Sequence, residues 1–148
     1  MELFLWRHAD ALMGIHDFER VLSPLGHQQA IKVAQWFSEH VPSDLRILVS
    51  PAVRARQTVA HFCENENDIR LCLPLYENVS VDEILAILGW PDITLPALIV
   101  GHQPQIGMLA DHLLADTPHP LSFRKSALLW LRLEPGQKSA CLVHVMEP

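Results

Sequence analysis

Three short apolar runs stand out along the chain. They cover residues 3–6, 45–49 and 97–100, and none of them shows a clean alternation of apolar and polar positions. Continuous apolar runs of this length, bounded by turn residues, are typical of strands that are covered on both faces of a sheet. The pattern therefore predicts a central sheet that is mostly parallel.

Helical patterns lie between these runs. Apolar residues recur near the helical period over residues 24–41, and Ser23 with the proline that follows it favours a helix start there. Ser50 is expected to cap a second helix, because a proline follows it as well. Residues 103–114 predict a third helix, and residues 81–88 a shorter one.

The later part of the chain indicates further strands. Residues 71–76 are expected to add one, while residues 126–133 and 141–146 resemble the two arms of a hairpin around the turn sequence at 134–137. The resulting fold class is α/β, a three-layer α/β/α arrangement in which helices flank a mostly parallel central sheet with some antiparallel edge strand. A chain of 148 residues fits one domain, which we assign to residues 1–148.

Composition narrows the classes of partner. Acidic residues outnumber basic ones, 17 to 11, so a general nucleic-acid surface is not expected. No apolar run approaches the ~18 residues of a membrane span, and the apolar start of the chain is too short for a signal-peptide core. Cys63, Cys72 and Cys141 are odd in number and form no C-x-x-C pair. A disulfide framework or structural zinc site is therefore not expected, and we predict a cytoplasmic protein that binds neither membrane nor nucleic acid.

Charged and titratable residues follow each of the three apolar runs. Arg7 and His8 follow the first run, Arg54 comes shortly after the second, and His102 follows the third. In open α/β sheets the carboxyl ends of the strands place ligand chemistry at one edge. Two histidines and two arginines at such an edge predict a site for a doubly charged anion, most simply phosphate.

The residue types suggest a division of labour. His8 is the candidate nucleophile, because an imidazole is largely neutral near pH 7 and can carry a phosphoryl group covalently. Arg7 and Arg54 are candidates for binding the phosphoryl oxygens, and His102 could donate a hydrogen bond to the same group. Arginine stabilises this charge without a metal, and the histidines lack ligand spacing such as H-E-x-x-H, so no metal or cofactor is expected.

Taken together, these motifs resemble those of a known family. The family is the histidine phosphatase superfamily, also called phosphoglycerate mutase-like. The strings that carry the resemblance are Arg7-His8, Ser50-Pro51-x-x-Arg54-Ala55-x-Gln57-Thr58 and Gly101-His102-x-Pro104. A further segment, Arg20 followed by Leu22-Ser23-Pro24-Leu25-Gly26 and then Gln29-Ala30, is similar to the one after the first histidine of SixA-type phosphohistidine phosphatases.

The resemblance implies roles for five residues. His8 would be the phosphorylated nucleophile, Arg7, Arg54 and His102 would form the phosphate pocket, and Arg20 would be a further substrate-binding member. The implied activity is that of a phosphatase with a phosphohistidine enzyme intermediate. Its substrate would be a phosphorylated protein, such as a histidine phosphorelay domain, because the compact chain favours an open site.

Two departures from the family pattern stand out. Ala9 takes the place of the usual glycine after the first histidine, and its Cβ would cost about 1 kcal/mol or more if that position were left-handed. Larger relatives carry an insertion with a glutamate general acid between the second and third motifs, where this chain is short. Glu77 best matches that acid, and Asp10 is an alternative because it lies near His8.

Other functions remain open from the sequence. One is a small-molecule phosphomonoesterase or a mutase, either of which would take a small phosphate ester. Another is a phosphate-binding module that has lost turnover. Hydrolysis of a phosphohistidine protein, compared with hydrolysis of sugar phosphates and phosphoglycerate, would distinguish these readings.

Overall fold

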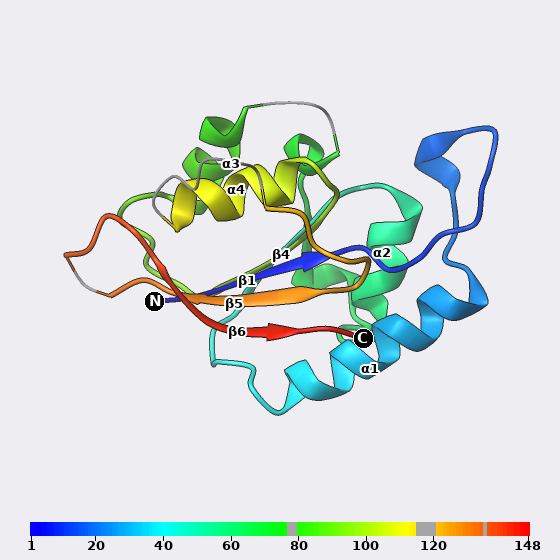
Figure 1. Ribbon diagram of the computed structural model, residues 1–148, viewed down its shortest axis with the longest axis horizontal. Coiled ribbons are helices and arrows are strands. Elements are labelled where there is room, and N and C mark those ends of the chain that lie inside the picture. The colour runs from blue at the N-terminus through cyan, green and yellow to red at the C-terminus, as the bar shows by residue number, and fades with distance from the viewer. Residues whose placement is uncertain (77–79, 115–120, 135) are drawn as a thin grey trace.

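The central element is one sheet. The computed structural model describes residues 1–76, 80–114, 121–134 and 136–148, so Glu77 lies outside the described residues. Among the described residues the sheet has six strands in the order β3-β2-β4-β1-β5-β6 (Figure 1). Their bounds are β1 Glu2–Arg7, β2 Arg46–Val49, β3 Ile69–Leu71, β4 Ala97–Gly101, β5 Leu128–Arg132 and β6 Cys141–Met146.

The sheet is mixed in the way that the sequence predicts. β1, β2, β3 and β4 pair in parallel, whereas β5 runs antiparallel to β1 and β6 runs antiparallel to β5. The expected hairpin of residues 126–133 and 141–146 is therefore confirmed, and it forms one edge of the sheet. Parallel strands need a crossover connection, and helices supply it between the strands of the parallel part.

Helices cover both faces of this sheet. Their bounds are α1 Pro24–Ser38, α2 Val53–Ala60, α3 Val81–Leu88 and α4 Gln105–Leu113. Figure 1 shows α3 and α4 on one face and α1 and α2 toward the other. The short 3-10 turns are η1 Asp17–Glu19, η2 Glu66–Asp68 and η3 Leu73–Leu75. The predicted α/β/α class is confirmed.

Two apolar clusters explain why the apolar runs lack alternation. In β1, Leu3 and Leu5 pack into the cluster beneath α3 and α4, while Phe4 and Trp6 pack into the cluster against α1 and α2. All four side chains are fully buried. Successive residues of a strand point to opposite faces, so a strand covered on both faces is apolar at every position.

Two local expectations are wrong. Residues 71–76 do not continue a strand, because β3 ends at Leu71 and η3 follows, with Pro74 in its first turn. Proline has no N–H for a ladder hydrogen bond and favours the start of a helical turn. Similarly, Ser50 does not cap α2, which begins at Val53 after an Ala52 N-cap.

The reason for the later start of α2 lies in the sheet. The backbone N–H of Ser50 still donates to the carbonyl of Val100, at 2.9 Å, so Ser50 extends the pairing of β2 with β4. By contrast, Ser23 caps α1 as predicted, because its side chain accepts from the N–H of Gly26. Within the described residues, no helix is both long and apolar enough to cross a membrane.

Candidate active site

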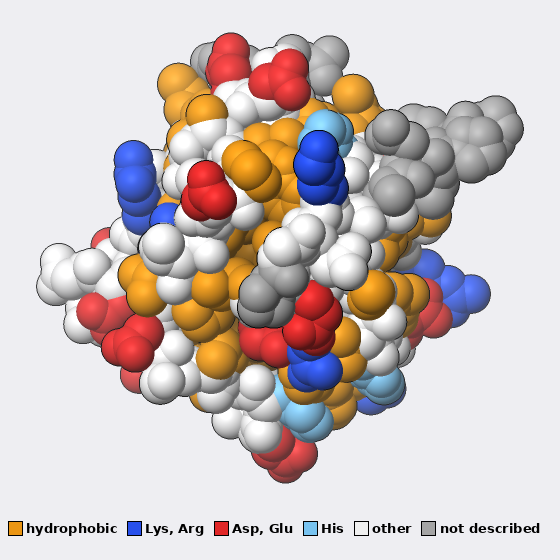
Figure 2. Space-filling model, turned by 90° about the vertical axis from the view of Figure 1, so that its left-hand side faces the viewer, with side chains coloured by type: hydrophobic (Ala, Val, Ile, Leu, Met, Phe, Trp, Pro, Cys, Tyr) orange, Lys and Arg blue, Asp and Glu red, His pale blue; other side chains and the backbone are white. Residues whose placement is uncertain are grey.

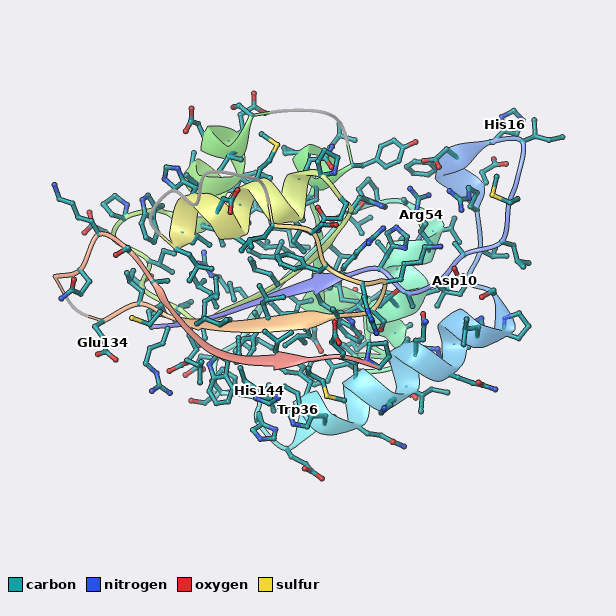
Figure 3. The ribbon with its side chains drawn as sticks, viewed as in Figure 1. Asp10, His16, Trp36, Arg54, Glu134 and His144 are labelled. Atoms are coloured by element: carbon teal, nitrogen blue, oxygen red, sulfur yellow. The ribbon has the colours of Figure 1, made fainter. Side chains whose placement is uncertain are left out.

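The predicted residues meet at the carboxyl edge of the parallel strands. Arg7 pairs with Gly101 at the ends of β1 and β4, and the N–H of His8 donates to the Gly101 carbonyl at 2.9 Å. This register brings the rings of His8 and His102 to a centroid separation of 4.9 Å. Figure 3 shows Arg54 and Asp10 in the same region, beyond the tip of β1.

The tautomer of His8 follows from one backbone contact. Its Nδ1 lies 2.7 Å from the carbonyl oxygen of Ala9, and a carbonyl can only accept, so Nδ1 carries the proton and Nε2 carries the lone pair. Nε2 faces the guanidinium of Arg54, whose Nε–H donates to it at 3.4 Å. Burial lowers the pKa of His8 to about 4, since the opposing effect of the Ala9 bond is smaller and the nearby charges of Arg54 and Arg7 lower the pKa further. His8 therefore presents a neutral, unprotonated nitrogen at neutral pH.

The second histidine is positioned by Ser50. The two side chains lie 2.7 Å apart, from Nε2 of His102 to the Ser50 hydroxyl. Nδ1 of His102 is buried and has no hydrogen-bond partner among the described residues. Burial lowers the pKa of His102 to about 3, and the positive charge of Arg54 acts in the same direction, against a smaller opposing effect of Asp17. Ser50 is thus a positioning residue of the site rather than a helix cap.

Arg7 lies half-buried at the end of β1. One terminal nitrogen donates to the carbonyl of Phe123, and the backbone N–H donates to Ala127 at 3.0 Å. The Nε of Arg7 is buried with no hydrogen-bond partner among the described residues, as is that of Arg46 elsewhere in the fold. Burial lowers the pKa of Arg7 from its usual value. The Arg7 guanidinium thus places a positive charge close enough to His8 to lower the pKa of that imidazole.

Arg54 is fixed from two sides. Its terminal nitrogens donate to the backbone carbonyl of Asp17 at 2.6 Å and to the Asp17 carboxylate at 3.0 Å, while its Nε faces His8. The side chain is only 7% exposed. These contacts hold the planar guanidinium with its Nε edge toward His8.

The backbone at Ala9 does not adopt the left-handed conformation that would strain an alanine. The described non-glycine residues with positive φ are Asp44 and Ser126, so Ala9 is not left-handed. Its methyl group is fully buried against the α1 and α2 face of the sheet. Its N–H donates to the hydroxyl of Thr58 at 3.0 Å, which ties the backbone beside His8 to α2. Alanine therefore fits this position without distortion.

Asp10 and Arg20 are engaged elsewhere. The Asp10 carboxylate accepts from Lys125 at 2.5 Å and from Ser23 at 2.6 Å, and these bonds hold its pKa below the usual value. An ionised carboxylate with both oxygens occupied is a poor proton donor, which argues against Asp10 as the acid. Arg20 donates to the Leu12 carbonyl and to the Asp17 carboxylate, so it reaches Arg54 only through Asp17.

The structure also brings in residues that the sequence did not single out. Asp17 contacts both Arg54 and Arg20, and the hydroxyl of Tyr76 lies 3.4 Å from its carboxylate. The ring of Tyr76 packs edge-on against His102 with a centroid distance of 5.8 Å. Nothing local to the sequence marks Asp17 beyond its position three residues before Arg20, because its main partner comes from α2.

Comparison with known proteins identifies related sequences. Residues 3–85 match the sequence model of the histidine phosphatase superfamily (branch 1). A phosphohistidine phosphatase SixA homolog of Haemophilus influenzae is 32% identical over an alignment 162 positions long. The alignment covers 100% of this chain and 97% of that protein.

Solved structures share the fold. The structure of the protein histidine phosphatase SixA complexed with tungstate superposes with a TM-score of 0.85 at 25% identity, covering 99% of this chain and 97% of that one. A phosphoserine phosphatase mutant of Entamoeba histolytica in complex with phosphoserine gives a TM-score of 0.73 at 16% identity, with 97% and 95% covered. At 16% identity, the similarity to the phosphoserine phosphatase shows a shared fold only.

Proposed function

Because this chain belongs to the histidine phosphatase superfamily, we propose that it is a phosphohistidine phosphatase in which His8 carries the phosphoryl group between two displacement steps. The chain is a phosphatase of that superfamily, and the proposal concerns its substrate and the roles of its residues. The observation that supports it best is the bond from His8 Nδ1 to the Ala9 carbonyl, which leaves Nε2 unprotonated and facing Arg54.

In the first step, Nε2 of His8 attacks the phosphorus. The Nε2–P bond forms, and the bond from phosphorus to the leaving group breaks with its electron pair going to that group. The imidazole of His8 becomes a phosphoimidazolium, and the Ala9 carbonyl stabilises its positive charge by accepting from Nδ1–H. In the second step, water attacks the phosphorus, the electron pair of the Nε2–P bond returns to His8, and one proton passes to solvent.

Two arginines and His102 would stabilise the charge on the phosphoryl oxygens. The guanidinium groups of Arg7 and Arg54 both act on His8 and would supply charge-assisted donors without a metal. If the Ser50 hydroxyl donates to His102 Nε2, the proton of that ring lies on Nδ1, which has no hydrogen-bond partner among the described residues. Because this nitrogen is buried, it would serve as a third donor to the phosphoryl group after a small shift of the ring.

Phosphohistidine on a protein is the substrate that we propose. The full-length similarity to a SixA homolog supports this class, and a histidine phosphorelay domain would be a partner of the right chemistry. A small phosphate ester stays the alternative for the same pocket. The three cysteines are free thiols, which supports the proposal of a reducing cytosolic location.

The test compares the wild type with His8→Ala on a histidine-phosphorylated protein, a sugar phosphate and phosphoglycerate. We expect the wild type to release phosphate fastest from the protein substrate and to yield an acid-labile phosphoenzyme when quenched. We expect His8→Ala to do neither while keeping its circular dichroism spectrum. Equal turnover by the two proteins would refute the nucleophile, and faster release from an ester would favour the alternative substrate class.

A further inference from the structure

A carboxylate stands at the mouth of the site. The side chain of Asp17, on η1, is 55% exposed, whereas that of Arg54 is 7% exposed and His8 is buried. Arg54 faces His8 with its Nε and Asp17 with its two terminal nitrogens. The order from the floor of the site to solvent is therefore His8, Arg54, Asp17.

Aromatic rings stand beside this carboxylate. The hydroxyl of Tyr76 donates to Asp17 at 3.4 Å, and the ring of Tyr76 meets Phe18 edge-on with a centroid distance of 5.1 Å. Phe18 is 41% exposed and is the neighbour of Asp17 on η1. The mouth thus combines an oxygen acceptor with apolar ring surfaces, which is the combination that suits a flat ring bearing an N–H group.

Asp17 is ionised at neutral pH. Burial raises the pKa of Asp17, but the hydrogen bonds and charges of Arg54 and Arg20 outweigh it and hold the pKa below its usual value. The carboxylate therefore accepts hydrogen bonds and has no proton to donate.

The geometry of displacement places the leaving group near Asp17. The attacking and leaving atoms of a phosphoryl transfer are roughly in line. His8 attacks from the buried floor, where its backbone N–H is bonded to β4. The leaving group therefore departs toward the exposed side, where Asp17 and Phe18 lie.

We propose that Asp17 selects N-phosphorylated imidazole over phosphate esters by accepting a hydrogen bond from the distal N–H of the leaving ring. This inference rests on the proposed function and names the residue that sets its substrate class. A phosphorylated imidazole whose distal nitrogen is protonated leaves as neutral imidazole, because the electron pair of the broken P–N bond goes to the ring nitrogen and no proton transfer is needed. A carboxylate beside the distal N–H favours this protonated ring.

The same carboxylate disfavours an ester. The electron pair of a broken P–O bond goes to an alkoxide or phenoxide oxygen, which gains negative charge and needs a proton. Ionised Asp17 supplies none, and its charge opposes the charge that develops on the oxygen. One group thus acts in opposite directions on the two substrate classes.

The experiment measures kcat/KM for N-phosphorylimidazole and for phenyl phosphate, two ring substrates of similar size. Asp17→Asn removes the charge and keeps an oxygen that can accept from Arg54. Its ratio of kcat/KM for N-phosphorylimidazole to kcat/KM for phenyl phosphate should fall at least about tenfold relative to wild type, the loss expected for a hydrogen bond to a charged group. Glu19→Gln removes a carboxylate from the same turn and should leave the ratio unchanged.

Each other outcome overturns the assignment. An equal loss of kcat/KM for both substrates, which leaves the ratio unchanged, would show that Asp17 only positions Arg54. Unchanged kcat/KM values for both substrates would show that Asp17 does not meet the leaving group. Asp17→Glu, which restores the charge on a longer side chain, should recover part of the ratio. Circular dichroism and thermal melts of all variants exclude misfolding as the cause. Failure of wild type to hydrolyse either phosphorylated imidazole or a phosphohistidine protein would instead count against the proposed function.

Discussion

Burial of two neutral histidines should make the fold sensitive to mild acid. His8 and His102 have pKa values of about 4 and about 3 in the folded protein, lowered by burial from the ordinary histidine value of 6.5. Because the unfolded chain binds protons more readily than the folded one, their contribution to stability is present above pH 6.5 and is lost as the pH falls toward the folded pKa values.

The size of the effect follows from these values. Between pH 7 and pH 5, the free energy of unfolding should fall by about 2 kcal/mol for each of the two histidines. At pH 5 each imidazole is almost fully protonated in the unfolded chain and almost unprotonated in the folded protein. Replacing His102 with glutamine removes one titrating group. The His102→Gln variant should therefore lose about 2 kcal/mol less than wild type over this range.

Urea denaturation at both pH values measures the difference. His16→Gln, a substitution of an exposed histidine, controls for the exchange itself. An equal pH dependence in wild type and His102→Gln would refute the reasoning, because it would show that burial does not keep the imidazole of His102 neutral. His8→Gln, measured in the same way, should also lose less stability than wild type between pH 7 and pH 5.

Three further substitutions test single contacts. Gly26→Ala should destabilise the fold by about 1 to 3 kcal/mol despite the better helix propensity of alanine, because a Cβ would meet the carbonyl oxygen of Asp10 at 1.9 Å. A raised melting temperature would contradict this close contact. Ala9→Gly, which restores the residue usual in the family, should lower the free energy of unfolding by about 1 kcal/mol, because a fully buried methyl is lost from a position that is not left-handed. A more stable variant in urea titrations would disprove this. Ser50→Ala should reduce kcat/KM at least about tenfold with an unchanged fold, because His102 loses the hydrogen bond that orients its ring. Full activity in steady-state kinetics would exclude this positioning role of Ser50.

The course of the chain was largely predictable from its pattern. The apolar runs at residues 3–6, 45–49 and 97–100 correspond to β1, β2 and β4, because strands buried on both faces must be apolar at successive positions. The start of α1 followed from Ser23, whose hydroxyl caps the helix as its sequence context indicates. These features depend on residues that are close in the sequence, so they can be predicted from the local sequence pattern.

Where prediction failed, a distant partner decided the local structure. Ser50 has the residue type of a helix cap, yet its backbone pairs with Val100 and its hydroxyl contacts His102. Residues 71–76 are the exception, because there a local feature decided: Pro74 favours a helical turn, and η3 replaces most of the expected strand. The assignment of Glu77 as the acid stays a prediction, since that residue lies outside the described part of the chain.

The sequence by itself determined the alternation of strands and helices and the motifs that follow each strand, because periodicity and motif spacing are properties of the chain. Only the tertiary structure decided what those motifs do to one another. The proton on His8 is placed by the Ala9 carbonyl, the edge of Arg54 is aimed by Asp17, and the ring of His102 is held by Ser50. Most of these partners come from different elements, and hydrogen-bond direction and burial, which set their charge states, exist only once those elements are packed together.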